Sequence, residues 1–167
     1  MNLPLVFHLI LTPKLRYTLK MARYLLDTNI FTFLETDEGD QINRDVRAIL
    51  QDYENEFLMS MESVRELIVA YRNGKVISKF FSSPLELIES IERDYGIRII
   101  QTDMEVMRTM AKLEINTIEE HNDPSDHVII SQAMTMKLPL ISSDHKFPWY
   151  RTQGLELIYN GKERTKI

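Results

Sequence analysis

Short apolar runs alternate along this chain with segments in which apolar residues recur every three or four positions. The runs cover residues 24–26, 57–59, 97–100, 138–141 and 155–159, and each has the length of a buried strand. Between them, the spacing predicts helices over residues 40–53, 61–71, 84–96, 102–113 and 124–137. Strands that alternate with helices are typical of an α/β fold, so we expect a mostly parallel central sheet of about five strands.

Capping residues support the starts and ends of these helices. Ser83 and Thr102 each stand three residues before a glutamate, which is the capping-box pattern at a helix start. Pro84 suits the first helical position, and Gly96 suits the stop of the same helix. The Asp-Pro pair at 123–124 predicts another helix start.

The length of 167 residues fits one domain, and no repeat or Pro/Gly-rich linker divides the chain. Residues 1–20 differ from the rest, because their charged side chains are all basic and Met21 directly precedes the first strand pattern. Their apolar run, 3–11, is too short to cross a bilayer and has no basic residue before it, as a signal peptide would. We therefore expect an N-terminal extension over residues 1–20 and a core domain over residues 21–167; an extra helix packed on the domain is the alternative.

Composition narrows the class of protein. The chain has no cysteine, which excludes a disulfide scaffold, a thiolate zinc site and a thiol nucleophile. With 44% hydrophobic residues it can bury a core, and we expect a cytoplasmic protein that does not enter a membrane. The net charge of −5 argues against a general nucleic-acid binder with a basic face. This charge is compatible with an enzyme that holds nucleic acid through a metal ion.

Four acidic residues occupy positions at which an α/β sheet carries chemistry. Asp27 and Asp144 directly follow predicted strands, Asp126 lies in the first turn of the helix after residue 123, and Glu66 flanks the apolar stripe of helix 61–71. Ligands of open parallel sheets bind outside the carboxyl ends of the strands. Each acid also has an ordinary explanation as a helix cap, a turn residue or a member of a surface ion pair.

Taken together, the four acids indicate a metal site. All four positions are expected at the same edge of one sheet, where carboxylates repel one another unless they bind a cation. Hard oxygen ligands suit Mg²⁺ or Mn²⁺. Such ions orient phosphate oxygens and activate water, so phosphodiester hydrolysis is the chemistry that the pattern favours.

The motifs that carry these acids resemble those of the PIN-domain nucleases in order and spacing. They are Tyr-Leu-Leu-Asp-Thr-Asn at 24–29, Ser60 with Glu66, His-Asn-Asp-Pro-Ser-Asp at 121–126, and Leu-Ile-Ser-Ser-Asp at 140–144. The chain is most similar to VapC-like toxins of bacterial toxin–antitoxin systems. Many of these carry an Asp-Pro-x-Asp segment, then an apolar helix with a Gln-Ala pair, here at 132–133.

The resemblance implies a three-layer α/β/α fold and Mg²⁺- or Mn²⁺-dependent cleavage of RNA by an endoribonuclease. It also implies a homodimer and inhibition by a small antitoxin protein. It assigns the metal ligands and catalytic acids to residues Asp27, Glu66, Asp126 and Asp144. Only the resemblance selects Glu66 over its neighbour Glu62.

The resemblance gives supporting roles to three further residues. Ser142 would hold the site through its hydroxyl, Asn29 would bind metal water or substrate, and Asp123 would be a cap or support. His127 departs from the family, because relatives often have Arg there. We expect the four histidines of the chain at the surface or the rim of the site, and Trp149 and Tyr150 in packing.

Two other functions compete with the nuclease. A haloacid-dehalogenase-like phosphatase would use Asp27 as a nucleophile, but it wants a second Asp two residues later, where this chain has Asn29. A degenerate PIN domain that acts only as a binding scaffold would not need the four acids, which are all present.

Overall fold

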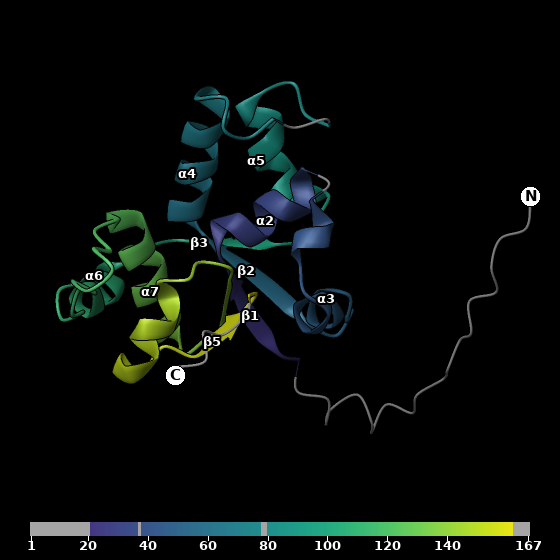
Figure 1. The fold of residues 1–167 in the computed structure, drawn as a ribbon. Helices are drawn as coiled ribbons and strands as arrows, with labels where there is room; N and C mark the ends of the chain where they lie inside the picture. The colour runs from purple at the N-terminus through teal and green to yellow at the C-terminus, as the bar shows by residue number, and fades with distance from the viewer. Residues whose placement is uncertain (1–20, 37, 78–79, 162–167) are drawn as a thin grey trace, which may run out of the picture.

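Five parallel strands form one sheet in this computed structural model, which describes residues 21–36, 38–77 and 80–161. The strand order is β3-β2-β1-β4-β5 (Figure 1). The bounds are β1 (Arg23–Leu26), β2 (Glu56–Ser60), β3 (Arg98–Ile100), β4 (Leu140–Ser142) and β5 (Leu157–Tyr159). The chain adds strands on one side of β1 and then on the other, so the order reverses between β1 and β4. The predicted α/β class and parallel sheet are confirmed.

Helices cover both faces of the sheet. They are α2 (Thr28–Glu35), α3 (Arg44–Leu50), α4 (Met61–Arg72), α5 (Pro84–Arg93), α6 (Met104–Met110) and α7 (Pro124–Met136), with the 3-10 helices η1 (Gly39–Gln41) and η2 (Phe147–Gln153). Figure 1 places α2, α4 and α5 on one side of the sheet and α6 and α7 on the other. This is the three-layer arrangement that the resemblance implies.

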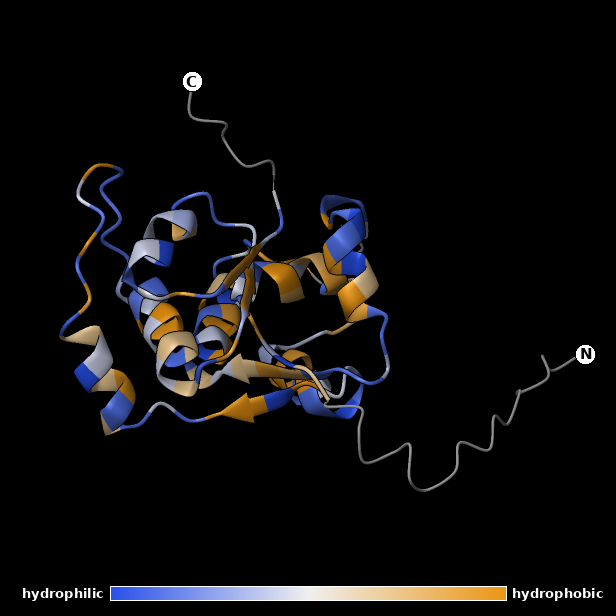
Figure 2. Cartoon of the chain, turned by 90° about the horizontal axis from the view of Figure 1, so that it is seen from below, coloured by the Kyte–Doolittle hydropathy of each residue, from blue (hydrophilic) through white to orange (hydrophobic). Residues whose placement is uncertain are grey.

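Neighbouring residues of β1 bury their side chains on opposite faces. Leu25 packs in a core cluster with α7 and η2, whereas Leu26 packs in a second cluster with α2, α4 and α5. Both side chains are fully buried. Figure 2 shows that the strands consist largely of hydrophobic residues. A strand buried on both faces is apolar throughout, which is why the short runs of the sequence predict the strands correctly.

The structure corrects four local predictions. Helix α2 was not predicted, and the expected helix 40–53 is a 3-10 turn followed by the shorter α3. The apolar face of the expected helix would include Tyr53, which is fully exposed (101%) because the helix ends before it. Asp103, not Thr102, caps α6 by accepting hydrogen bonds from the Glu105 and Val106 amides. The apolar spacing of the predicted helix 61–71 would place Met61 in its buried stripe, but this first residue of α4 is 37% exposed.

The predicted extension over residues 1–20 lies outside the described residues. Within the part that the structure describes, no helix is both long and apolar enough to cross a membrane.

Tyr150 is fully buried and Trp149 packs against it with ring centroids 5.0 Å apart, so their predicted packing role is confirmed.

Candidate metal centre

Asp27 lies at the switch point of the sheet, between the end of β1 and the start of α2. Its Oδ1 accepts the Thr28 amide hydrogen at 2.8 Å, and this caps α2. Its Oδ2 accepts the hydroxyl hydrogen of Ser142 at 2.6 Å. Asp27 is only 3% exposed. The helix-cap role therefore uses one carboxylate oxygen, while the other faces the neighbouring strand.

Ser142 joins Asp27 to Asp144. Leu26 pairs with Ile141 in the parallel register, so Asp27 and Ser142 come next on adjacent strands. The Ser142 Oγ donates to Asp27 and accepts from the Asp144 amide at 3.0 Å. The Asp144 carboxylate in turn accepts from the Lys146 amide at 2.7 Å. One buried hydroxyl thus ties the carboxyl end of β1 to the turn that presents Asp144.

Helix α4 brings Glu66 toward Asp27 and leaves Glu62 further out. Ser60 ends β2 beside β1 and caps α4, accepting from the Glu62 amide at 3.1 Å. The Glu66 Oε2 accepts from the Thr28 hydroxyl, next to Asp27 in the chain. Glu62 instead pairs with Arg65 at 2.6 Å. The structure therefore separates the two glutamates that the sequence pattern alone does not distinguish.

Asp126 reaches the same region from the first turn of α7. Asp123 caps this helix by accepting from the Ser125 amide at 2.9 Å, as expected of a capping residue. One oxygen of Asp126 contacts the His121 Nε2 at 2.8 Å. The Asp126 side chain is 19% exposed, so its carboxylate lies at the boundary between the core and solvent.

Burial and mutual repulsion make the central carboxylates hard to ionise. Burial raises the pKa of Asp27 to about 7; the Ser142 hydrogen bond opposes this, and the charge of Asp126 adds to it. Burial also raises the pKa of Glu66 to about 7, against the Thr28 hydrogen bond and again with help from Asp126. Carboxylates with raised pKa values that share a site are relieved by a bound cation.

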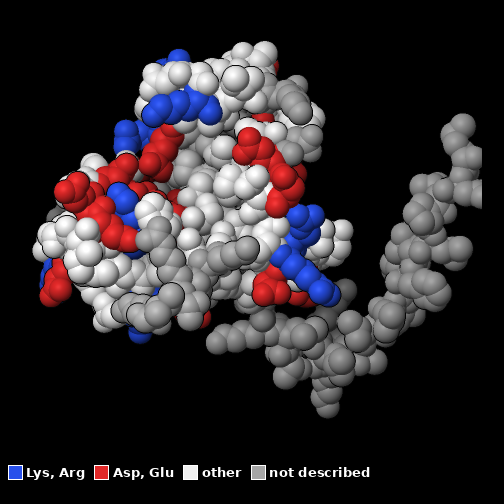
Figure 3. All heavy atoms as spheres, in the orientation of Figure 1, with Lys and Arg blue, Asp and Glu red and all other residues white. Residues whose placement is uncertain are grey.

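The acids line an open cleft. A cavity of about 470 Å³ is bordered by Asp27, Glu66 and Asp126 and continues between α2 and α4 past Phe33 to Lys75. Figure 3 shows acidic side chains gathered where α4 meets α6 and α7, with basic side chains beside them. The chemistry of these oxygen donors fits a divalent cation such as Mg²⁺ or Mn²⁺.

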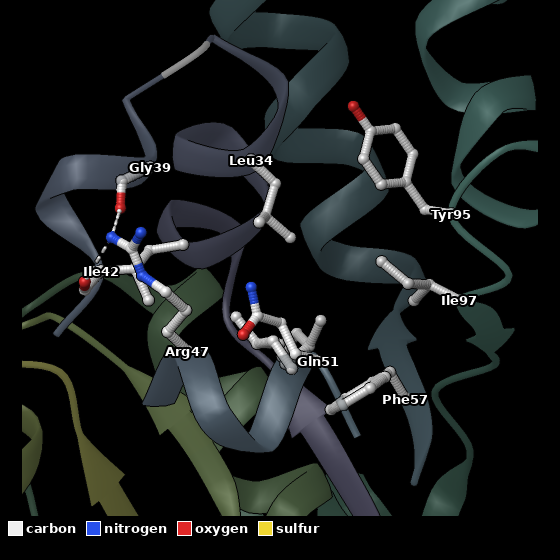
Figure 4. A pocket seen from close by; sticks show the side chains of 10 residues that line it. Leu34, Gly39, Ile42, Arg47, Gln51, Phe57, Tyr95 and Ile97 are labelled. Atoms are coloured by element: carbon white, nitrogen blue, oxygen red, sulfur yellow. Dashed lines mark hydrogen bonds between the residues drawn. The ribbon is translucent and has the colours of Figure 1, made fainter. Parts of the chain in front are cut away.

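A second cavity, of about 330 Å³, lies between α2, α3 and the start of β2 (Figure 4). Leu34, Ile42 and Phe57 contribute to its apolar wall, and the Arg47 guanidinium donates to the Gly39 carbonyl at 2.6 Å. None of the described residues that line this cavity is acidic. The cavity is therefore no alternative location for the metal chemistry.

The structure shows a contact of Asn29 that the sequence does not predict, and it corrects one expectation about the histidines. The Asn29 Oδ1 accepts from the Ser143 amide at 3.3 Å, so this side chain holds the end of β4; its predicted contact with metal water or substrate stays a prediction. The expectation that the histidines lie at the surface or rim is wrong for two of them. His121 is 1% and His127 is 5% exposed. The sequence does not indicate that His121 is buried, because this residue lies in the loop before α7, where there is no helical or strand periodicity from which burial can be predicted.

His127 occupies the interior and makes no surface ion pair of the kind that Arg could make. Its Nε2 lies 3.0 Å from the His121 carbonyl oxygen and 3.2 Å from the Tyr150 hydroxyl. Burial lowers the pKa of His127, with a further contribution from His121. The departure from the family pattern at this position is thus accommodated by packing against Tyr150.

Comparison with known proteins places these motifs in a family. The family model described as PIN domain matches residues 24–152, which include the four acids. No curated protein matches the chain significantly.

Solved structures share the fold at low sequence identity. A chain of VapBC2 from Rickettsia felis, bound to a DNA fragment from its promoter, has 20% identity and a TM-score of 0.60, with 82% of this chain and 98% of that chain covered. VapBC-1 from nontypeable Haemophilus influenzae has 21% identity, a TM-score of 0.56 and coverage of 84% and 99%. DNA-bound VapBC from Salmonella typhimurium has 17% identity, a TM-score of 0.57 and coverage of 84% and 100%.

Proposed function

This chain belongs to the PIN domain family, and from that membership we propose that it is a metal-dependent endoribonuclease. The observation that carries the proposal is the meeting of Asp27, Glu66 and Asp126 in one cleft, with Asp144 joined to Asp27 through Ser142. We assign the metal-ligand and catalytic roles to these four acids, and Mg²⁺ or Mn²⁺ to the site. A divalent cation held there would polarise a phosphate oxygen and lower the pKa of a water molecule bound to it.

The chain's own residues prepare the site for this chemistry. Ser142 and the Thr28 amide hold the two oxygens of Asp27, so this carboxylate cannot rotate without losing both hydrogen bonds. The Thr28 hydroxyl holds Glu66 beside it. Because these groups are positioned before any cation arrives, binding costs little reorganisation. The pKa values of about 7 mean that cation binding displaces protons from Asp27 and Glu66 near neutral pH.

The cleft beside the acids supports a polymer as substrate. It extends from Asp126 between α2 and α4 to Lys75, to which we assign a contact with a further phosphate of the substrate. Arg65 at the rim donates to Glu62 and to the Ser125 hydroxyl, so it is a fixed positive group beside the cleft. A small phosphate ester would use only the acidic end of such a cleft, whereas an RNA strand would use its length.

We further propose that the chain is the VapC-like toxin of a toxin–antitoxin pair, acts in the cytoplasm, forms a homodimer and binds a small antitoxin protein. The support is the family and the likeness to chains of the VapBC structures, which the present chain matches over nearly their full length. Residues 1–20 would be an extension outside the catalytic domain, since the family match begins at residue 24.

The rival functions have less support. A haloacid-dehalogenase-like phosphatase wants an acid where Asn29 stands, and Asn29 is engaged with the Ser143 amide. A degenerate scaffold would have no use for a buried Asp27 and a half-buried Glu66 whose ionisation is costly.

A cleavage assay tests the proposal. The protein, purified free of any partner, is incubated with RNA and with Mg²⁺ or Mn²⁺, beside the variants Asp27→Asn and Asp144→Asn. Asp103→Asn is the matched control, because Asp103 caps α6 away from the cleft and Asn is an equally good cap. We expect cleavage by the wild type and the control only. Cleavage that persists in both site variants would overturn the metal centre, and hydrolysis of small phosphate esters without RNA cleavage would favour the phosphatase.

A further inference from the structure

A buried hydrogen-bond network lies behind Asp126. His121, His127 and Tyr150 come from the loop before α7, from α7 and from η2, and all three are at most 5% exposed. The Tyr150 hydroxyl lies 2.9 Å from the His121 Nδ1, and the His121 Nε2 lies 2.8 Å from an Asp126 oxygen. The network therefore ends on one of the four acids of the cleft.

The partners decide where each hydrogen lies. The His121 carbonyl oxygen can only accept, so the His127 Nε2 at 3.0 Å must carry a hydrogen and donate it. That nitrogen cannot then accept from the Tyr150 hydroxyl at 3.2 Å. The backbone N–H of Asn116, whose nitrogen lies 3.5 Å from the same hydroxyl oxygen, is also a donor.

The Tyr150 hydroxyl hydrogen must therefore go to the His121 Nδ1, the one acceptor among its partners in the described part of the chain. A nitrogen that accepts has no hydrogen of its own, so the neutral His121 ring carries its hydrogen on Nε2. Nε2 faces Asp126 and donates to it. The direction of every hydrogen bond in the network follows from the backbone carbonyl at its start.

We propose that His121 is a positioning residue of the metal centre, which holds Asp126 through Nε2–H while Tyr150 sets the tautomer. This rests on the proposed function, because Asp126 must be a ligand for its orientation to matter. With one Asp126 oxygen tied to His121, the other is free for a cation. Partners that orient metal ligands in this way typically contribute about 10–100-fold to metal affinity.

The same network argues against His121 as a ligand itself. His121, Asp126 and Asp144 bring one ligand atom each within 4.8 Å of one another, which is close enough for a shared ion. Metal binding needs a bare nitrogen lone pair, however, and the bare nitrogen is Nδ1, which is occupied by Tyr150. A positioning role and a ligand role of His121 therefore predict different nitrogen-15 NMR spectra and different coupling of bound Mn²⁺ to histidine nitrogen.

Mn²⁺ affinity, measured by titration calorimetry without RNA, tests the proposal in the full chain. His121→Leu removes the donor and should weaken Mn²⁺ binding about 10–100-fold. His121→Gln places an amide N–H where Nε2 was and should recover most of the loss. Trp149→Phe, which alters packing against Tyr150 without touching Asp126, should bind like the wild type. Far-UV circular dichroism checks that each variant is folded.

Nitrogen-15 NMR of the wild type tests the tautomer even if a variant does not fold. We expect the Nε2–H form of His121, and a shift of the tautomer population in Tyr150→Phe. Wild-type Mn²⁺ affinity in His121→Leu, an Nδ1–H tautomer, or electron-spin-echo coupling of bound Mn²⁺ to a histidine nitrogen would each overturn the proposal. Wild-type protein that binds no Mn²⁺ would overturn the metal centre and this inference with it, whereas unchanged affinity in His121→Leu overturns this inference alone.

Discussion

Replacing Asp27 by Asn should stabilise the protein at pH 8 when no divalent cation is present, although the variant loses the proposed activity. Asp27 has a pKa of about 7 in the folded protein against 3.8 for an unperturbed side chain. A carboxyl whose pKa is raised by folding contributes stability below about pH 4, and this is lost as the pH rises through about 7. The difference corresponds to about 4 kcal/mol at pH 8 relative to acid pH.

Asn cannot ionise, so the variant avoids this cost. It keeps one of the two hydrogen bonds that Asp27 makes with the Thr28 amide and the Ser142 hydroxyl, and losing the other costs about 1 kcal/mol. The net gain at pH 8 is therefore about 3 kcal/mol, or roughly 6–12 °C in Tm for a domain of this size. At pH 5 the wild-type side chain is protonated, so the gain should shrink toward zero.

Thermal unfolding in a chelator at pH 5 and pH 8 measures this effect, with Asp103→Asn as the control at an exposed acid outside the cleft. Adding Mn²⁺ should raise the Tm of the wild type and the control but not that of Asp27→Asn. A lower Tm for Asp27→Asn than for the wild type at pH 8 without cation would refute the reasoning, since it would mean that the folded protein accommodates the Asp27 charge without a cation.

Three further predictions follow from the contacts. Glu66→Gln should reduce RNA cleavage by about 100-fold or more, whereas Glu62→Gln should keep most of it, because Glu62 pairs with Arg65; initial rates at saturating Mn²⁺ decide this. Ser142→Ala removes a hydrogen bond that lowers the pKa of Asp27, so Mn²⁺ binding should require a higher pH than in the wild type, as calorimetry across pH 6–9 would reveal. Lys137 ends α7 in the left-handed region (φ 53°), so Lys137→Gly should raise the free energy of unfolding by up to about 1 kcal/mol in a urea titration.

The sequence predicts the sheet well because most strand positions are apolar, as at Leu25 and Leu26 of β1, which are buried on opposite faces of the sheet. It does not predict α2, because the segment from Thr28 to Glu35 is short and rich in β-branched and aromatic residues, which have low helix propensity. This helix is held by its cap at Asp27 and by packing of Ile30 and Phe31 in the core, which are tertiary effects. Local helix propensity therefore does not predict α2, the helix that follows β1 and borders the cleft.

The same limit applies to the acids. Asp27 and Asp144 can be located from sequence, because each follows a strand whose end the apolar pattern marks. Glu66 and Glu62 are equivalent in that pattern, and only the position of Thr28 on α2 distinguishes them. His121 is harder still, since its contact with Asp126 depends on a loop that folds over Tyr150.

The fold itself prepares the central carboxylate. A helix that starts directly after a strand needs a cap at the junction, and Asp27 supplies it with Oδ1. The parallel register then brings Ser142 beside the same residue, where it holds Oδ2. Both hydrogen bonds follow from starting α2 at the end of β1 next to β4, so they are present before any ligand binds. An acid that is buried and oriented for structural reasons, yet hard to ionise, is suited to take up a cation, and that combination makes Asp27 the most informative residue to mutate.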